Sequence, residues 1–340
     1  MVSNFSKYGA ISAKVRAMYG RRLRQADWDS LNSMRSVSSV ASYLKRHPGW
    51  AKPMENLPGI GATRRETEAV IRKAVINEYI RLFSFASLDD RGFMLFPVYR
   101  FEYETILSKL RSLKSGLKSH AGSPIPDFFK NRSKLDFNSL SLAESWSGIL
   151  QAVKHTLFYE ALLTAQSPHL ASLPDYTAVG VLLEGKYYEA INKFVSSRYK
   201  GATKDLFVRA LGQESDLLNL IHIMRLKRFF PDSSRSLDSV LFPVHYRLRR
   251  DFFDRVIAAP DYNSALSLID GTYYAKFFRD RQFDKIEDYY REKIELFNRR
   301  ELLSAPPSPY TATAYLTLKE FEVRRLNSAI ERAYYTGLNL

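Results

Sequence analysis

Residues 320–332 read Glu-Phe-Glu-Val-Arg-Arg-Leu-Asn-Ser-Ala-Ile-Glu-Arg, and two related stretches begin upstream, at Glu102 and at Asp216. With Glu102, Asp216 and Glu322 aligned, every copy has apolar residues at the same three following positions: Tyr103, Ile106 and Leu110; Leu217, Leu220 and Met224; Val323, Leu326 and Ile330. Steps of three and four residues bring side chains onto one face of a helix. The pattern predicts three similar helices, each with an acidic residue at the start of its buried face.

A basic residue stands nine positions after the acid in the first two copies, whereas the third copy has Glu331 there and its basic residue one position later. Copies separated by roughly a hundred residues indicate one helical unit used three times. The candidates for partner contacts or for the repeat motif are charged and amide residues of these stretches: Glu102, Arg111, Glu214, Asp216, Asn219, Arg225, Glu320, Glu322 and Arg332. We expect the three repeated acids to serve the helix dipole or a buried contact rather than catalysis.

A second similarity links residues 174–188 with residues 260–274. Both contain Pro-Asp-Tyr, a pair of aliphatic residues, an acid followed by Gly, and Tyr-Tyr, at constant spacing. We expect a short helix in each, beginning after the proline and ending at Gly185 or Gly271. Residues 37–47 are the expected counterpart in the first repeat, and each repeat is expected to run from a long helix through a short one to the motif helix.

Other segments also carry helical periodicity. It continues from residue 3 to about residue 45 and ends at His47-Pro48, because the residue before a proline is driven out of the α region. Thr63-Arg-Arg-Glu66 is a capping box that predicts a helix through Phe85. A long helix is expected from about Leu140 to Thr164.

Alternation with a period of two is almost absent, so the predicted fold is all-α. Residues 114–135 are rich in Lys, Ser, Gly and Pro and have little periodicity, which indicates a boundary. The expected division is a helical repeat at 1–116, a basic linker at 117–138, a second repeat at 139–231 and a third at 232–340.

Composition narrows the class of protein. The chain of 340 residues is 45% hydrophobic and contains no cysteine, so it can build a core but no disulfide and no Cys-based metal site. No apolar run approaches the ~18 residues that a membrane span needs, and the N-terminus lacks the apolar block of a secretory signal. The formal charge of +15 points to an anionic partner: a nucleic acid, a membrane surface or an acidic protein.

Motifs of enzyme chemistry are weak. Residues 180–187 fit the nucleotide-binding pattern of Gly, four residues and Gly-Lys, but Tyr187 replaces the Ser or Thr that binds magnesium, and the intervening residues are apolar. The six histidines are scattered without metal-site spacing. We therefore expect no catalytic residue, no cofactor and no metal.

Basic residues gather in two stretches, of which the first contains one acid, Asp127. They are Lys109, Arg111, Lys114, Lys118, Lys130, Arg132 and Lys134, and then Arg225, Lys227, Arg228, Arg235, Arg247, Arg249 and Arg250. Interleaved aromatic residues keep a nucleic-acid-binding protein open as an alternative, although none of the known modules matches. An acidic protein partner or a solvated face accounts for the charge better.

The three motif helices, residues 8–22 and residues 314–323 together resemble the C-type central-stalk component of V-type and A-type rotary ATPases, which is called the d subunit in eukaryotes. The resemblance covers nearly the whole chain. Its most specific pieces are the helix with Asp216, Asn219 and Arg225 and the helix with Lys319-Glu-x-Glu322. The copies depart from one another where Thr105 and Arg325 replace the asparagine.

The resemblance implies three helical bundles arranged with pseudo-threefold symmetry around a funnel. It implies a non-catalytic role in the central stalk, with the funnel seated on the membrane rotor ring at its cytoplasmic face and holding the tip of the shaft, which is built from D- and F-type subunits. It implies no nucleic acid, and contact with the membrane only through the ring. A helical enzyme would instead need a cluster of acids or histidines in a pocket, for which the sequence offers no candidate.

Overall fold

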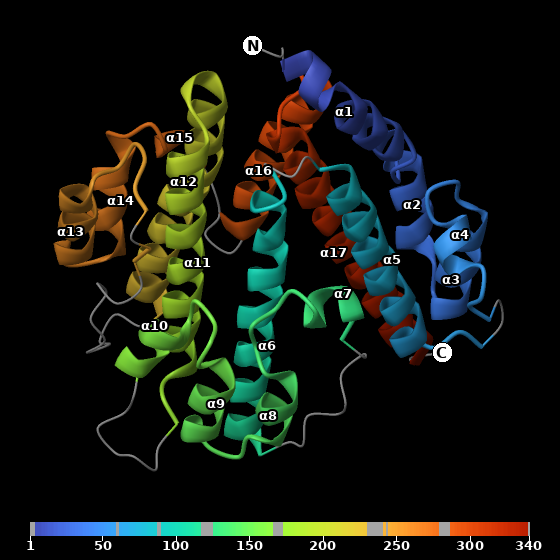
Figure 1. Cartoon of the computed structure of the whole chain (residues 1–340), viewed down its shortest axis with the longest axis horizontal. Helices are drawn as coiled ribbons and strands as arrows, with labels where there is room; N and C mark the ends of the chain where they lie inside the picture. The colour runs from blue at the N-terminus through green and yellow to red at the C-terminus, as the bar shows by residue number, and fades with distance from the viewer. Residues whose placement is uncertain are drawn as a thin grey trace. The chain divides into compact units, whose positions relative to one another are not determined.

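The computed structural model describes residues 4–58, 61–86, 90–116, 125–165, 173–229, 241–242, 244–278 and 286–338. These residues form α-helices, one 3-10 helix and connecting turns, and no strand occurs among them, so the all-α prediction is confirmed (Figure 1). The chain divides into two compact units, Met1–Asp89 with Arg291–Leu340, and Asp90–Tyr290. The repeat boundaries expected after residues 116, 138 and 231 remain a prediction.

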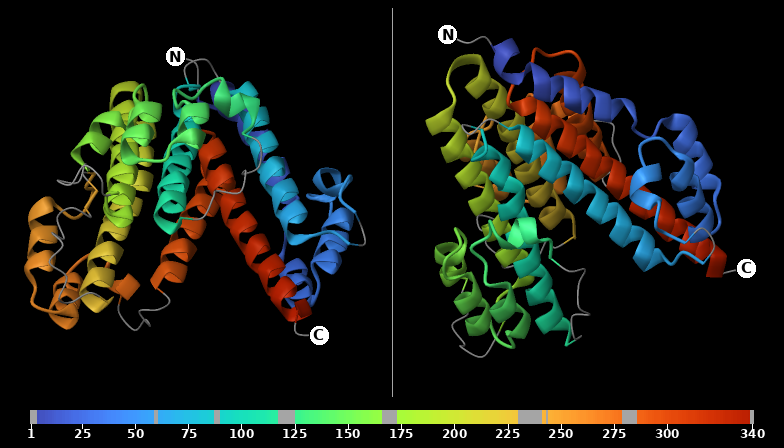
Figure 2. Two further views of the ribbon diagram at one scale, coloured as in Figure 1. Left: turned by 90° about the horizontal axis from the view of Figure 1, so that it is seen from below. Right: turned by 45° about the vertical axis from the view of Figure 1, so that its right-hand side comes forward.

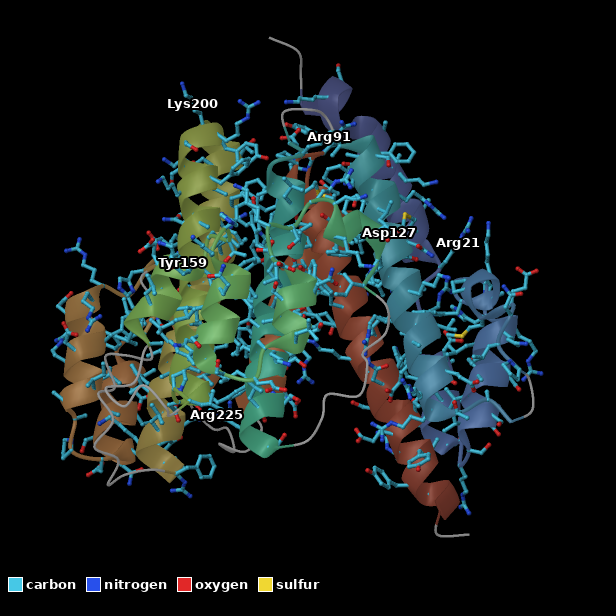
Figure 3. All side chains as sticks on the ribbon, turned by 60° about the horizontal axis from the view of Figure 1, so that its bottom comes forward. Arg21, Arg91, Asp127, Tyr159, Lys200 and Arg225 are labelled. Atoms are coloured by element: carbon cyan, nitrogen blue, oxygen red, sulfur yellow. The ribbon has the colours of Figure 1, made fainter. Side chains whose placement is uncertain are left out.

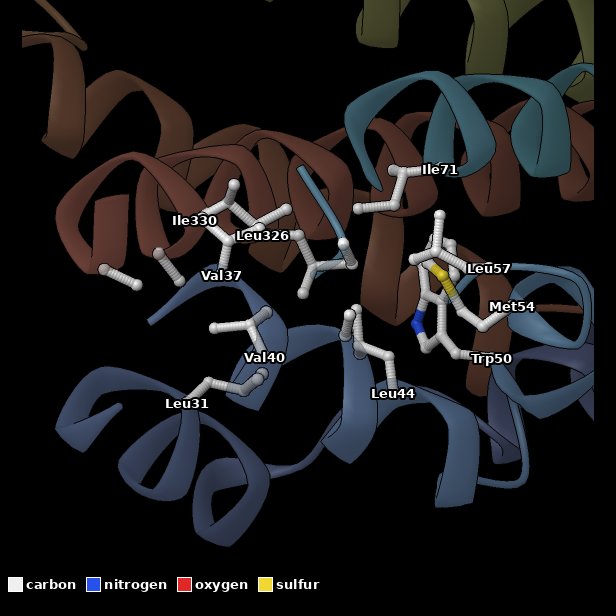
Figure 4. Packing of buried hydrophobic residues seen from close by; sticks show 14 of the residues in the cluster. Leu31, Val37, Val40, Leu44, Trp50, Met54, Leu57, Ile71, Leu326 and Ile330 are labelled. Carbon is white, nitrogen blue, oxygen red and sulfur yellow. The ribbon is translucent and has the colours of Figure 1, made fainter. Parts of the chain in front are cut away.

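The first unit joins the two ends of the chain. Its helices are α1 (Asn4–Gly20), α2 (Gln25–Ser33), α3 (Val37–Arg46), α4 (Ala51–Met54), α5 (Arg64–Phe85), most of α16 (Ile286–Leu303) and α17 (Tyr310–Leu338). Helix α17 runs with α1 on one side and α5 on the other (Figure 2, right). Its apolar face packs into a core with α2 to α5. Figure 4 shows Leu326 and Ile330 of α17 against Val37, Leu44 and Ile71.

Local signals explain where several of these helices begin and end. The capping box at Thr63 is confirmed, because the Glu66 N–H donates to Thr63 Oγ1 at 3.2 Å and the Thr63 N–H donates to Glu66 Oε2 at 3.0 Å. Helix α3 ends at Arg46, as expected before Pro48. The periodic run from residue 3 to 45 is three helices, and Ser36 starts the third by accepting the Ser39 N–H at 3.2 Å.

The two largest hydrophobic cores among the described residues of the second unit are each built on one motif helix. Its elements are η1 (Phe93–Leu95), α6 (Phe96–Ser115), α7 (Asp127–Lys130), α8 (Phe137–Leu142), α9 (Trp146–Val153), α10 (Tyr159–Thr164), α11 (Tyr176–Arg198), α12 (Gly201–Phe229), α13 (Arg250–Ala258), α14 (Tyr262–Asp270), α15 (Ala275–Phe278) and the start of α16. One core packs α6 against α8 to α11, and the other packs α12 against α13 to α15.

The helix expected from Leu140 to Thr164 is wrong, because three short helices occupy this segment. The helix cannot continue through Ser145, because the backbone of Ser145 is extended. Its hydroxyl caps the next helix, α9, by accepting the Gly148 N–H at 3.2 Å. Thr156 makes the next break, since its hydroxyl donates to the Val153 carbonyl and accepts the Phe158 N–H. Small hydroxyl residues compete with helical backbone bonds in this way.

The expected equivalence of residues 174–188 and 260–274 is also wrong. Asp175 and Asp261 both cap helices, but the first helix is α11 with 23 residues and the second is α14 with 9. Gly185 is buried in the interior of α11, whereas Gly271 is the C-cap of α14. Residues 180–187, which partly fit the nucleotide-binding pattern, form a helical segment of α11, so their backbone amides are held in helical geometry.

The same order of helices occurs three times along the chain. Three short helices come first, followed by a longer helix: α2 to α5, α8 to α11, and α13 to α16. The first set packs against the motif helix α17 and the second against α6, and α13 to α15 with the start of α16 pack against α12. The short helices therefore cover one face of a motif helix. The expected order of long helix, short helix, further helices and motif helix fits the first repeat, which begins with α1, but it is wrong for the second and third, because short helices come first among their described residues.

Candidate functional site

The acid of each motif helix is bonded to the turn that leads into the three short helices of its core. On α12, Asp216 is fully buried and accepts the backbone N–H groups of Tyr246, Arg247 and Leu248 at 3.0, 2.8 and 3.2 Å. The Tyr274 hydroxyl donates a fourth hydrogen bond, at 2.9 Å. Two carboxylate oxygens thus hold a turn and a side chain that lie 30 to 58 residues further along the chain.

On α6, Glu102 is 1% exposed and makes the corresponding contacts. Its Oε1 accepts the Ser133 hydroxyl at 2.6 Å and the Lys134 N–H at 3.0 Å. The Leu135 N–H donates to the Ser133 hydroxyl at 3.0 Å. The turn at 133–135 leads into α8, as the turn at 246–248 leads into α13.

On α17, Glu322 holds the turn before α2, which belongs to the other end of the chain. The Leu23 N–H donates to its Oε2 at 3.0 Å, and the Trp50 indole N–H donates to its Oε1 at 3.1 Å. Lys319, only 8% exposed, donates to Oε1 at 2.7 Å and lies over the Trp50 ring at 4.0 Å. The third copy therefore adds a buried cation to the same kind of anchor.

Burial raises the pKa of Glu102 and of Asp216, and the hydrogen bonds from the turns act in the opposite direction. A buried carboxylate is stable only if donors replace the lost water. The donors to each acid lie in the turn that leads into the short helices packed against its own motif helix, and Asp216 has Tyr274 in addition. The arrangement therefore has the properties of a structural anchor, which agrees with the expectation of a buried contact.

The sequence reasoning missed the aromatic residue that completes each anchor. Trp50, Phe158 and Tyr274 directly precede α4, α10 and α15, and each is fully buried. Trp50 and Tyr274 donate to their acids, whereas Phe158 has no donor and the Ser133 hydroxyl bonds to Glu102 instead. The sequence does contain a signal for these residues, because an aromatic residue precedes the third short helix of each set. The incorrect alignment of residues 174–188 with residues 260–274 obscured this pattern.

The remaining candidates have separate roles. Asn219 is fully buried and forms two hydrogen bonds with the Phe242 backbone. Its side-chain oxygen accepts the Phe242 N–H at 2.7 Å, and its amide nitrogen donates to the Phe242 carbonyl at 3.4 Å. Arg111 donates to the Tyr176 hydroxyl, and Glu214 accepts the Tyr290 hydroxyl at 2.8 Å. The structure does not bring these residues together into one site.

Three candidates lie toward the surface. Arg332 is exposed and donates to Asn32 Oδ1 at 2.8 Å. Glu320 is half-buried, and Arg225 is exposed on α12 (Figure 3). These positions are at least partly accessible from solvent, in contrast to the three buried acids.

Some of the clustered basic residues serve helix ends. Lys227 donates to the carbonyls of Ile257, at 2.8 Å, and of Ala259 at the end of α13. Lys109 donates to the Ser141 carbonyl in α8 at 2.7 Å. Lys118 and Arg235, which belong to the predicted clusters, lie outside the described residues.

The described residues contain no group of three His, Asp or Glu side chains that could hold a metal ion. Among the described helices, none combines the length and the apolar composition required to cross a membrane. The family described as ATP synthase (C/AC39) subunit matches residues 11–336 of the chain. No match to the chain was found among curated proteins.

Proposed function

Because the chain belongs to the ATP synthase (C/AC39) subunit family, whose members are subunits of V/A-type rotary ATPases, we propose that it couples the central shaft to the membrane rotor ring. In this role the chain carries torque and performs no chemistry of its own. ATP hydrolysis or synthesis takes place in other subunits, and the chain needs no cofactor.

The observation that supports this role best is the anchor formed three times by Glu102, Asp216 and Glu322. A part that carries torque must resist deformation. Each anchor joins a long helix to the turn of a packed helical set through two or more hydrogen bonds to a buried carboxylate. Such charge-assisted bonds in a low-dielectric interior are stronger and more directional than exposed ones.

We place the three helical sets around a funnel with pseudo-threefold symmetry, one end on the rotor ring and the other around D- and F-type shaft subunits. Contact with the membrane is made through the ring, at the cytoplasmic face. The charge of +15 favours acidic partner surfaces and raises the rate of encounter with them.

The test is reconstitution of a V/A-type ATPase with and without this chain. We expect the complex that lacks the chain to hydrolyse ATP without driving ions across the membrane, and the full-length chain to restore ion transport. The isolated chain is expected to bind the shaft subcomplex and to hydrolyse nothing.

A nucleic-acid shift assay at physiological salt serves as the comparison. Tight binding of duplex or single strands, together with no affinity for shaft or ring, would favour the nucleic-acid alternative and reject the proposal. The family match does not favour that alternative.

A further inference from the structure

A hollow of about 350 Å³ lies within the first unit, beside the anchor of Glu322. Residues of the turn before α2, of α2 itself, of α16 and of α17 line it. Four of the lining residues are arginines: Arg22, Arg24, Arg299 and Arg325. We call this hollow the arginine pocket.

Two of these arginines rest on aromatic rings of the pocket. The guanidinium carbon of Arg22 is 4.3 Å from the centre of the Tyr19 ring, and that of Arg325 is 4.2 Å from the centre of the Trp28 ring. Both rings are buried, with 7% and 5% exposure. A guanidinium held in this way has lost part of its conformational freedom before any ligand arrives, which favours recognition of planar oxyanions.

None of the four arginines forms an ion pair with a carboxylate among the described residues, in contrast to Arg64, Arg100 and Arg250, which pair with acids one helical turn away. Of the two acids that line the pocket, Glu322 already bonds to Leu23, Trp50 and Lys319. Glu295 is the other. With four arginines against the two acids, the lining of the pocket carries an excess of positive charge.

We propose that the arginine pocket binds an acidic peptide segment of a partner protein, with carboxylates bonded to the arginines. Its volume is at the small end of the range of ligand pockets, roughly 300–1,000 Å³, and suits a few side chains. Leu318 and Phe321, which are largely buried, form the small apolar part of its lining.

A peptide fits the charges of the lining better than a free phosphate does. A phosphate concentrates about two negative charges in one group, and Glu295 and Glu322 of the same lining would repel it. A peptide distributes single charges and also has backbone N–H groups that can face these acids. The proposed function supplies a possible source of the segment, but the binding chemistry does not depend on it.

The test uses the full-length chain and a fluorescently labelled peptide that contains several Asp and Glu residues, followed by anisotropy. A peptide with Asn and Gln at the same positions measures binding without charge. The variant Arg299→Gln with Arg325→Gln removes two arginines of the pocket. The control variant, Arg300→Gln with Arg324→Gln, changes the net charge equally at the two neighbouring positions, which do not line the pocket.

We expect the pocket variant to weaken binding of the acidic peptide by about tenfold or more, because it removes charge-assisted hydrogen bonds from two of the four arginines. The control should change binding less than about twofold, because Arg300 and Arg324 do not line the pocket. Equal weakening by both variants would show that net charge alone attracts the peptide, and would reject the site.

Two further results would also overturn the proposal. Inorganic phosphate that displaces the peptide at low concentration would identify a small-anion site. A single-stranded oligonucleotide that binds more tightly than the peptide, and loses binding in the pocket variant only, would identify a nucleic-acid site. No other subunit of a rotary ATPase takes part in this titration, so its failure is distinguishable from failure of the proposed function.

Discussion

At the scale of single residues, the geometry of the carboxylate explains why an acid recurs at 102, 216 and 322. An ionised carboxylate is an acceptor only, with two oxygens and about four positions for hydrogens. Asp216 uses this capacity on three backbone N–H groups and one hydroxyl. Neither an amide nor a hydroxyl of similar size accepts as many bonds, so the residue type follows from the number of donors in the turn.

Replacing Asp216 by Asn is therefore expected to destabilise the second unit. The amide keeps one accepting oxygen and directs its own N–H₂ group toward donors, and each buried donor left without a partner costs about 1–3 kcal/mol. We expect the free energy of unfolding in denaturant to fall by about 2 kcal/mol or more. Asp254→Asn is the control, because Asp254 is exposed and forms a surface ion pair with Arg250; it should change stability by no more than about 0.5 kcal/mol. Equal losses in both variants would contradict the role of the buried anchor.

Glu184 on α11 gives a second expectation, for pH. Burial raises its pKa from 4.5 to about 7; Arg100 opposes the shift, and the charges of Glu214 and Glu104 add to it. Between these two pH values the folded chain keeps a proton that the unfolded chain has lost. The contribution of Glu184 to stability therefore falls as pH rises through this window, by on the order of 3 kcal/mol at most.

Unfolding midpoints measured from about pH 5 to pH 8 test this expectation. Glu184→Gln should reduce the decline in stability and make the protein more stable than the wild type above pH 7. The matched control is Glu189→Gln on the same helix, because Glu189 is exposed and pairs with Lys186. If the wild type and Glu184→Gln lose stability in parallel, another group is responsible for the pH dependence.

At the scale of elements, local sequence determined the helix ends well where a side chain and a neighbouring backbone group suffice. The capping box at Thr63 and the stop at His47-Pro48 are of this kind, and both are confirmed. Periodicity alone could not divide residues 140–164, because apolar residues of consecutive short helices continue a helical pattern by chance. Gly185 was misleading for a similar reason: a glycine near an apolar run predicts a helix end, but here it occupies a buried position inside α11.

Gly212 on α12 has a packing role that the sequence did not reveal. A Cβ at this position would lie 2.5 Å from Cβ of Tyr246, in the turn that Asp216 binds one helical turn further on. Gly212→Ala should displace this turn and lower stability by about 1–3 kcal/mol. Gly180→Ala on α11 is the comparison, because the nearest atom beyond its own helix is 3.9 Å away. That variant should leave stability unchanged or raise it by up to about 1 kcal/mol through higher helix propensity.

Thermal and denaturant unfolding of the two glycine variants measures the difference directly. Exchange of the amide hydrogens of Tyr246, Arg247 and Leu248 adds a local measurement, since these hydrogens are bonded to Asp216. Faster exchange in Gly212→Ala alone is the expected result. A stable Gly212→Ala with unchanged exchange would mean that the turn can move without loss of the anchor.

At the scale of the whole molecule, the limit of sequence reasoning was the pairing of distant segments. The apolar stripe and the acid of each motif helix were predicted correctly, but their partners lie far away in sequence: Leu23 and Glu322 are separated by 299 residues. Periodicity shows that a face is buried and gives no information about what covers it. Only the fold revealed that the last helix completes the core of the first ones, and that three short helices cover each motif helix.

The net charge of the chain leads to a prediction about the rates of binding to the shaft, and this prediction rests on the proposed function. An excess of fifteen positive charges should speed association with an acidic shaft surface, and salt screens this attraction over ~8 Å at physiological strength and ~3 Å at 1 M. Contacts that hold a shaft under torque must be buried and fitted in shape, so they determine dissociation and respond weakly to salt.

Association and dissociation rates of the chain and the shaft subcomplex, measured over a series of salt concentrations, separate the two contributions. We expect the association rate constant to fall by roughly tenfold or more over the series while the dissociation rate changes little. Lys114→Glu, a reversal at an exposed position near the end of α6, should slow association further without changing dissociation. If dissociation instead accelerates with salt as steeply as association slows, exposed ion pairs hold the complex. In that case the buried, shape-fitted contact required for torque is absent, and the coupling role must be abandoned even if the two proteins bind.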